Sequence, residues 1–177
     1  MRALSLNEIN NCIDDPSVKK SLKKNIRPAP IVAGLSTEDW ANLDFLTISS
    51  RDKRNGLLII DTNENVYVAP YELSPLRGDS STGRLKPIIC DFCKTWQTGS
   101  RAATISFRPN PRSLDTIGFL CCADLQCSLH VRDKTVDSKT SRAQLRENIG
   151  VEERINRLRS KLDSLIKRLS LAPIELS

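Results

Sequence analysis

The sequence has little of what most catalytic sites and membrane spans require. Its 177 residues include a single histidine, His130, and only 5% aromatic residues. A histidine–metal nuclease needs several histidines, and no nucleophile–base pair stands out, so we expect no enzymatic activity. The chain also lacks a run of about 20 apolar residues that could span a membrane, and residues 1–8 lack the apolar core of a signal peptide. We therefore expect a cytoplasmic protein that does not bind membranes.

Four of the six cysteines form two pairs with the spacing of zinc ligands. Cys90-x2-Cys93 would place two thiolates on one tight turn, and Cys122-x4-Cys127 would supply two more. Two strand-like runs separate the pairs, as in a treble-clef finger. The strand-like sequence after Cys93 disfavours a thioredoxin-like redox motif, and the lack of a signal peptide disfavours disulfides. These four residues therefore predict one structural zinc ion.

The third ligand could be either of two adjacent cysteines, Cys121 and Cys122. Residues 118–121 have the pattern of an apolar strand, and Asp124 is a candidate N-cap for a helix that contains Cys127. A thiolate in the first turn of that helix is favoured by the helix dipole. Cys122, at the junction of strand and helix, can turn toward the metal, whereas Cys121 would pack as a small apolar side chain. We therefore favour Cys122.

Positive charge is concentrated in the second half of the chain. The net charge is +6, yet residues 1–80 hold 10 Lys and Arg against 11 Asp and Glu, whereas residues 81–177 hold 17 against 10. This asymmetry indicates a polyanionic partner such as RNA, the ribosome or an acidic protein. A solvated face on a basic protein is the alternative.

Helix starts are signalled twice in the first half. Ser5 and Glu8 form a capping box that opens a helix, in which Cys12 is expected to be a core thiol. The helical region must end before Pro28, because a residue that precedes proline is disfavoured in the helical conformation. A second capping signal, at residues 36–39, predicts a short helical turn that leads into an apolar segment.

Strand-like runs predict two hairpins. Residues 56–60 and 66–71 form the first, and residues 102–107 and 117–120 form the second, across a loop rich in proline. Residues 73–87 contain Ser, Gly and Pro and are expected to be a mobile connector.

A long amphipathic helix is predicted at residues 151–169, after a polar run at 133–142 that is expected to be an exposed loop. The apolar stripe of this helix consists of Val151, Ile155, Leu158, Leu162, Leu165 and Leu169. Fewer than three heptads make a short seam, so we expect the helix to pack against its own domain and the protein to be a monomer, with a dimer through 151–169 as the alternative.

These patterns together predict an α+β fold in three parts. Residues 1–80 form an N-terminal helix and β-hairpin, residues 81–135 form a treble-clef zinc finger, and residues 136–177 form an exposed loop and the long C-terminal helix.

Residues 118–132 resemble the signature that closes the zinc finger of the elongation factor G-binding proteins, the fusidic-acid-resistance family. The signature runs approximately Gly-x-Tyr-Ile-Cys-x-Asp-Leu-x-Cys-Ser-x-x-x-Arg. Its matching residues here are Gly118, Cys122, Asp124, Leu125, Cys127, Ser128 and Arg132. Residues 40–46 and 151–158 are also similar to segments of short, single-module, actinobacterial-type members, so the resemblance covers most of the chain.

The resemblance implies a fold, a partner and an activity. A protein of this type binds elongation factor G through its zinc finger and helps the factor leave the ribosome when fusidic acid would hold it there. Classical resistance proteins carry a longer N-terminal helical bundle, whereas residues 1–80 here have the pattern of a helix and a hairpin.

Candidate partner-binding residues lie on the knuckle and among the nearby cations: Phe92, Lys94, Trp96, Arg101 and Arg132. An exposed aromatic side chain beside cations on a metal-rigidified turn is suited to anchor a partner. For Trp96, packing over the hairpin is the alternative.

An RNA- or DNA-binding zinc finger is the alternative function. The cations that could follow a phosphate backbone are Arg101, Arg108, Arg112, Arg132, Lys134, Arg142 and Arg146, and the rings that could stack on bases are Phe92, Trp96, Phe107 and His130.

Overall fold

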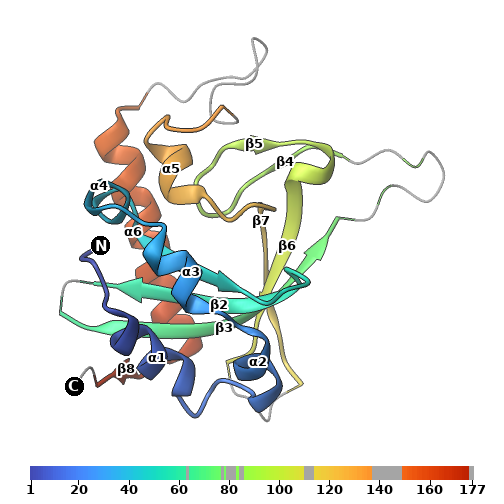
Figure 1. The fold of residues 1–177 in the computed structure, drawn as a ribbon. Coiled ribbons are helices and arrows are strands. Elements are labelled where there is room, and N and C mark those ends of the chain that lie inside the picture. Colours follow the sequence, from blue (N-terminus) through green and yellow to red (C-terminus); the bar gives the residue numbers. More distant parts are fainter. Residues whose placement is uncertain are drawn as a thin grey trace.

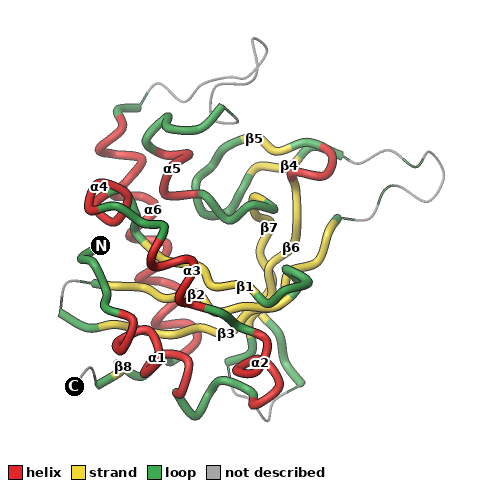
Figure 2. The backbone as a smooth tube through the Cα atoms, viewed as in Figure 1, coloured by secondary structure: helices red, strands yellow, loops and turns green. Residues whose placement is uncertain are grey.

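The computed structural model of the protein describes residues 1–62, 64–76, 78, 83, 86–109, 114–136 and 149–175. Its centre is an antiparallel sheet with the strand order β1-β2-β3-β6-β7, as Figure 1 shows. The strands are β1 (Phe45–Ser49), β2 (Asn55–Asp61), β3 (Val66–Pro75), β6 (Ala102–Phe107), β7 (Ile117–Cys122) and the short β8 (Pro173–Ile174), which pairs with the start of β3. A separate two-stranded ribbon, β4 (Ile88–Ile89) and β5 (Trp96–Gln97), lies beside β6 and β7 (Figure 2).

Both predicted hairpins are confirmed, and they are joined into one sheet. β2 pairs with β3 from Asn55 opposite Glu72 to Asp61 opposite Val66, and β6 pairs with β7. The second half of β3 also pairs with β6, from Tyr71 opposite Phe107 to Pro75 opposite Ala103. The segments 1–80 and 81–135 therefore share a continuous hydrogen-bonded sheet.

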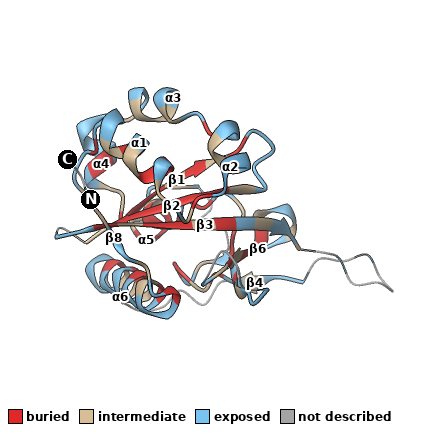
Figure 3. Cartoon of the chain, turned by 90° about the horizontal axis from the view of Figure 1, so that it is seen from below, coloured by how far each residue is buried: buried red, intermediate tan, exposed pale blue. Residues whose placement is uncertain are grey.

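Helices cover both faces of this sheet. The helices are α1 (Leu6–Asp14), α2 (Lys20–Asn25), α3 (Pro28–Ala33), α4 (Thr37–Ala41), the 3-10 turn η1 (Gly99–Arg101), α5 (Cys127–Val131) and α6 (Val151–Leu169). The N-terminal helices lie on one face and α6 lies on the other (Figure 3). Leu57 and Ile59 of β2 join the core under the N-terminal helices, whereas Leu58 and Ile60 join the core under α6. A strand covered on both faces is apolar throughout, which explains the continuous run in β2.

The two predicted capping boxes are present. Ser5 Oγ accepts a hydrogen bond from Glu8 N at 3.2 Å, and the Glu8 carboxylate accepts one from Ser5 N at 2.7 Å. The second box, formed by Ser36 and Asp39, opens α4. Cys12 is a fully buried thiol of α1, as expected.

The region before Pro28 contains two helices instead of one, and Pro28 itself begins α3. Proline is well suited to the first helical position because the N–H that it lacks would have no partner within the helix. The second helix, α2, has no buried residue among its six, all of which are described. A short helix without an apolar stripe leaves no periodic pattern in the sequence, so it was not predicted.

The long helix α6 begins and ends at the predicted residues. Five residues of the predicted apolar stripe, Ile155, Leu158, Leu162, Leu165 and Leu169, are buried against its own sheet and α5, as expected. The sixth, Val151 at the start of the helix, is 40% exposed. Within the described residues, no helix combines the length and apolar character needed to span a membrane. Of the predicted connector, residues 73–75 continue β3, and several later residues, like most of the predicted loop 133–142, lie outside the described residues.

Candidate metal centre

The first cysteine pair lies on a knuckle closed by the ribbon β4–β5. Ile89 pairs with Trp96 across the ribbon, Cys90 N donates to Thr95 O at 2.9 Å, and Lys94 N donates to Cys90 O at 3.0 Å. Lys94 has a φ of +59°, the left-handed conformation that a turn this tight requires. The knuckle therefore directs both thiols of the pair to the same side.

The second pair is placed by the end of β7 and the start of α5. Cys122 ends β7, and Cys127 is the first residue of α5, so the prediction that Cys127 lies in the first helical turn is confirmed. The N-cap, however, is Gln126 and not Asp124. Leu125 has a φ of +56°, which delays the helix, and the Asp124 carboxylate instead accepts a hydrogen bond from Gln126 N at 3.0 Å.

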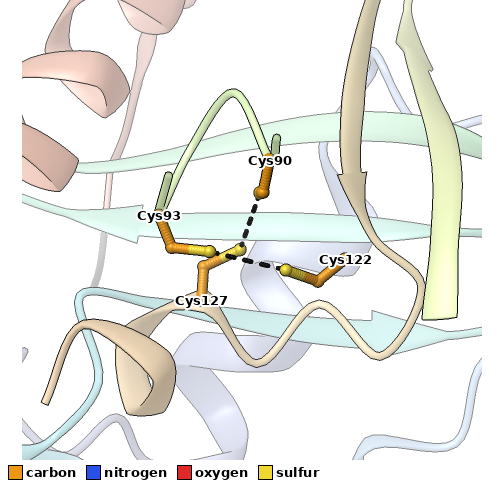
Figure 4. Close-up of side chains that lie close together, drawn as sticks. All are labelled: Cys90, Cys93, Cys122 and Cys127. Carbon is orange, nitrogen blue, oxygen red and sulfur yellow. Dashed lines mark hydrogen bonds between the residues drawn. The ribbon is translucent and has the colours of Figure 1, made fainter. Parts of the chain in front are cut away.

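The four sulfur atoms of Cys90, Cys93, Cys122 and Cys127 lie within 4.8 Å of one another. Cys90 Sγ is 3.7 Å from Cys127 Sγ, and Cys93 Sγ is 3.4 Å from Cys122 Sγ (Figure 4). Four thiolates at about 2.3 Å from a tetrahedral zinc ion are separated by about 3.8 Å, so the cluster has the right size. All four side chains are buried, and no cysteine of the chain forms a disulfide. The site fits one structural zinc ion.

Hydrogen bonding among the four thiols shifts their pKa values in opposite directions. Burial opposes ionisation of Cys93, but hydrogen bonds from Cys122 and Cys127 hold its pKa well below the ordinary value. Hydrogen bonding with Cys122 and Cys90 raises the pKa of Cys127 well above its ordinary value, because nearby thiolates compete for protons. A divalent cation at the centre favours all four thiolates and removes that competition. Burial also raises the pKa of Cys121, which packs in the apolar core instead.

His130 is a neighbour of the cluster that was not assigned to it from the sequence. Its ring is fully buried, with Nδ1 at 3.3 Å from Cys122 Sγ and Nε2 at 3.4 Å from an Asp124 oxygen. Burial alone would lower the pKa of His130, but the Asp124 carboxylate and Cys93 raise it to about 10. The imidazolium can donate to a thiolate and offset part of the negative charge of the cluster. The only sequence signal was its position, one helical turn after Cys127.

A buried carboxylate, Asp44, ties the finger to the sheet. Arg132 donates to both oxygens of Asp44, with Nη2 at 3.1 Å from Oδ1, and Arg159 of α6 donates to Oδ1 at 3.0 Å. Asp44 N donates to Ser128 Oγ at 3.0 Å, and Arg132 Nη1 also donates to the Ser128 carbonyl at 2.8 Å. Two residues of the signature, Ser128 and Arg132, thus hold α5 against the start of β1.

The structure places the five candidate partner-binding residues in different environments. Phe92 is only 4% exposed and makes an edge-to-face contact with Phe119, with ring centroids 5.6 Å apart. The Arg132 side chain is 9% exposed, beside Asp44. The expectation that Phe92 is exposed is therefore wrong, because the knuckle turns this ring inward, and Arg132 is covered by Asp44.

The remaining three candidates lie nearer the surface. Lys94 is exposed, and Trp96 is 41% exposed. Arg101 is partly buried and donates to Thr98 Oγ1 at 3.0 Å. Ile89, which faces Trp96 across the ribbon, is 60% exposed and was missed from the sequence because its strand is only two residues long. We call Ile89, Lys94 and Trp96 the knuckle surface.

The cations proposed to follow a phosphate backbone are engaged within the chain where they are described. Arg108 lies 3.6 Å from Glu72, Lys134 lies 3.2 Å from Glu38, and Arg132 pairs with Asp44. Arg101 donates to Thr98, and the remaining three, Arg112, Arg142 and Arg146, lie outside the described residues.

Comparison with protein families agrees with the metal centre. The family model described as the FBP C-terminal treble-clef zinc-finger matches residues 17–169, which include all four clustered cysteines. No curated protein and no solved structure gives a significant match. Because the match covers most of the chain, and because the four thiols have the arrangement of a zinc site, the protein belongs to the FBP C-terminal treble-clef zinc-finger family.

Proposed function

We propose that this protein binds elongation factor G, at or near the ribosome, through its zinc-stabilised finger. The resemblance of residues 118–132 to the elongation factor G-binding signature suggests the partner, and membership of the zinc-finger family supports it. The observation that carries the proposal is the exposed pair Ile89 and Trp96 on the cysteine knuckle. Binding would help the factor to leave the ribosome, in the manner of fusidic-acid-resistance proteins.

The knuckle surface has the features of a binding anchor. An isoleucine and a tryptophan face each other on a short ribbon, and Lys94 lies beside them. Aromatic side chains with an apolar neighbour are enriched among residues that dominate binding free energy. The zinc site fixes the turn between β4 and β5, so that little conformational entropy is lost when the partner binds.

We infer that the protein is cytoplasmic and monomeric. The apolar stripe of α6 is covered within the chain, which supports a monomer. Six free thiols suit a reducing compartment.

A titration of elongation factor G tests the proposal. In the variant Ile89→Ala/Trp96→Ala we expect the dissociation constant to rise at least tenfold, because truncation of a central anchor typically costs about 2 kcal/mol. The matched control is Leu114→Ala, an apolar residue that is 92% exposed and lies at the β6–β7 loop. Zinc content and thermal stability should be the same in both variants. Unchanged affinity in the double variant would place the interface elsewhere.

A titration with RNA at several salt concentrations distinguishes the RNA- or DNA-binding alternative from binding of elongation factor G. A phosphate-tracking protein loses affinity steeply as salt rises, whereas an apolar anchor is much less sensitive. Binding to RNA with a steep salt dependence, together with no affinity for the factor, would favour the alternative. Its support is the excess of positive charge in residues 81–177. Against it stands the burial of one of the proposed phosphate-contacting cations, Arg132, beside Asp44.

We also propose that the protein has no hydrolytic activity. The ring of His130 is buried between Asp124 and the cysteine cluster, so it cannot reach a substrate in this structure. Nuclease and peptidase assays with added zinc, manganese or magnesium should show no turnover above background. Turnover that disappears in a folded His130→Gln variant would contradict this expectation.

A further inference from the structure

A cavity lies at the end of the β6–β7 hairpin remote from the cysteines. The hairpin runs from Ala102 opposite Cys122, next to the metal centre, to Phe107 opposite Ile117. The cavity has a volume of about 400 Å³ and lies beyond this second end, against Ser106 and Arg108. Its size falls within the range of roughly 300–1,000 Å³ that is typical of small-molecule sites.

The walls of the cavity come from segments far apart in the sequence. They are α2 with the residues before it, the turn between β1 and β2, the middle of β3, the end of β6 with the two residues after it, and Leu171 after α6. Figure 1 shows α2 beside the end of the sheet where the β6–β7 hairpin turns. The N-terminal helical layer ends at α2, and this short helix buries none of its residues, all of which are described. The sheet is therefore incompletely covered at this point, which leaves the cavity.

Arg108 provides a hydrogen-bond donor that is not used within the described part of the chain. Its Nε is buried and has no hydrogen-bond partner there. Its Nη2 lies 3.6 Å from a Glu72 oxygen, which is long for a charge-assisted hydrogen bond. A buried guanidinium N–H without an acceptor is unfavourable. The rest of the guanidinium is accessible, since the Arg108 side chain is 34% exposed and lines the cavity.

The charge of the lining favours an anion. Lys19 and Arg51 line the cavity together with Arg108, and neither Lys19 nor Arg51 forms an ion pair with a described residue. One of the two lining carboxylates, Asp52, accepts hydrogen bonds from Ser50 Oγ at 2.6 Å and from Arg54 N at 3.1 Å. It is therefore satisfied within its own turn. The three cations outnumber the remaining carboxylate, Glu72.

The lining also has an apolar part. Leu22, Pro70, Tyr71, Pro109 and Leu171 contribute to the wall, and the Tyr71 hydroxyl is paired with Ser49 Oγ at 2.9 Å. Apolar side chains together with a few charged groups are the usual lining of a small-molecule site. We propose that this cavity binds a small organic anion, a carboxylate or phosphate attached to an apolar body, with Arg108 as its principal partner.

The test uses the full-length, zinc-loaded protein and defined probes. Phenyl phosphate and benzoate carry an anionic group and a ring, benzamide carries the ring without the charge, and inorganic phosphate carries the charge without the ring. Amide chemical shifts in a nuclear magnetic resonance titration report where each probe binds. We expect phenyl phosphate or benzoate to shift the amide signals of residues 50–55 and 106–108. Benzamide and inorganic phosphate should each bind at least about tenfold more weakly. Comparison of the affinities of phenyl phosphate and benzoate distinguishes a phosphate ligand from a carboxylate ligand.

Variants decide whether Arg108 is the partner. Arg108→Gln should lower the affinity for the anionic probe at least about tenfold. Lys53 is an exposed cation of the β1–β2 turn that does not line the cavity, so Lys53→Gln should have little effect. Leu22→Trp, which fills the cavity from α2, should abolish binding while thermal stability is retained. The absence of shifts at these amides with millimolar anionic probes, or equal affinities of Arg108→Gln and Lys53→Gln, would overturn the proposal. Ile89→Ala/Trp96→Ala should leave probe binding unchanged, so the two proposals can fail separately.

Discussion

Replacing Cys93 by serine should release the zinc ion and unfold the part of the chain that the metal holds together. The ion joins the knuckle, the end of β7 and the start of α5. Structural zinc contributes on the order of 10 kcal/mol to the folding of small fingers, which is comparable to the whole free energy of unfolding of a typical domain. Cys90→Ser, Cys122→Ser and Cys127→Ser should have the same effect. Zinc stoichiometry by mass spectrometry and urea unfolding measure both parts of this prediction.

The matched control for this series is Cys121→Ser. Cys121 is the neighbour of a ligand and is equally buried, but it belongs to the apolar core. A buried hydroxyl in its place should cost about 1–3 kcal/mol and leave one zinc ion bound. If Cys121→Ser lost the metal and Cys122→Ser kept it, the third ligand would be Cys121.

Removal of the Arg132 guanidinium should destabilise the protein strongly although the residue lies outside the metal centre. Arg132→Met removes the bidentate partner of the buried Asp44 carboxylate and leaves it the single ion pair with Arg159 among the described residues. Breaking a buried ion pair typically costs about 3–5 kcal/mol, because the remaining charge is not solvated. Urea unfolding of the zinc-loaded protein measures this cost.

An exposed ion pair provides the comparison. Lys134→Ala removes the contact with Glu38, in which both side chains are largely exposed, and pairs of this kind typically contribute less than about 1 kcal/mol. The double variant Asp44→Asn/Arg132→Met should be less destabilised than the sum of its single changes. The affinity for elongation factor G should stay unchanged in folded Arg132→Met. If Arg132→Met were as stable as Lys134→Ala but had lost affinity for elongation factor G, Arg132 would belong to the partner interface.

The elements that could be predicted from the sequence are those specified by residues close together in the chain. The capping boxes at Ser5 and Ser36, the stripe of α6 and the strand alternation of both hairpins depend on residues a few positions apart. The thiol cluster was predictable for the same reason, because C-x2-C spacing fixes the geometry of a knuckle.

Features that depend on distant partners were not predictable in this way. The pairing of β3 with β6 joins segments about 30 residues apart, and the apolar patterns of the two hairpins do not specify it. Arg132 has the signature of an exposed cation until its partner, 88 positions earlier, is known. Phe92 lies in a turn, where the direction of a side chain depends on the backbone conformation and not on a periodic pattern.

The continuous sheet has a consequence for any attempt to isolate the finger. A fragment that begins at residue 81 would lose β3, the strand that satisfies one edge of β6 from Ala103 to Phe107. That edge would present a row of unpaired backbone N–H and C=O groups, flanked by the apolar side chains of Ile105 and Phe107. An exposed apolar edge of this kind is a template for pairing with a second copy of the same strand. We therefore expect the isolated finger to self-associate even with its metal bound. In the intact chain, pairing with β3 prevents this association.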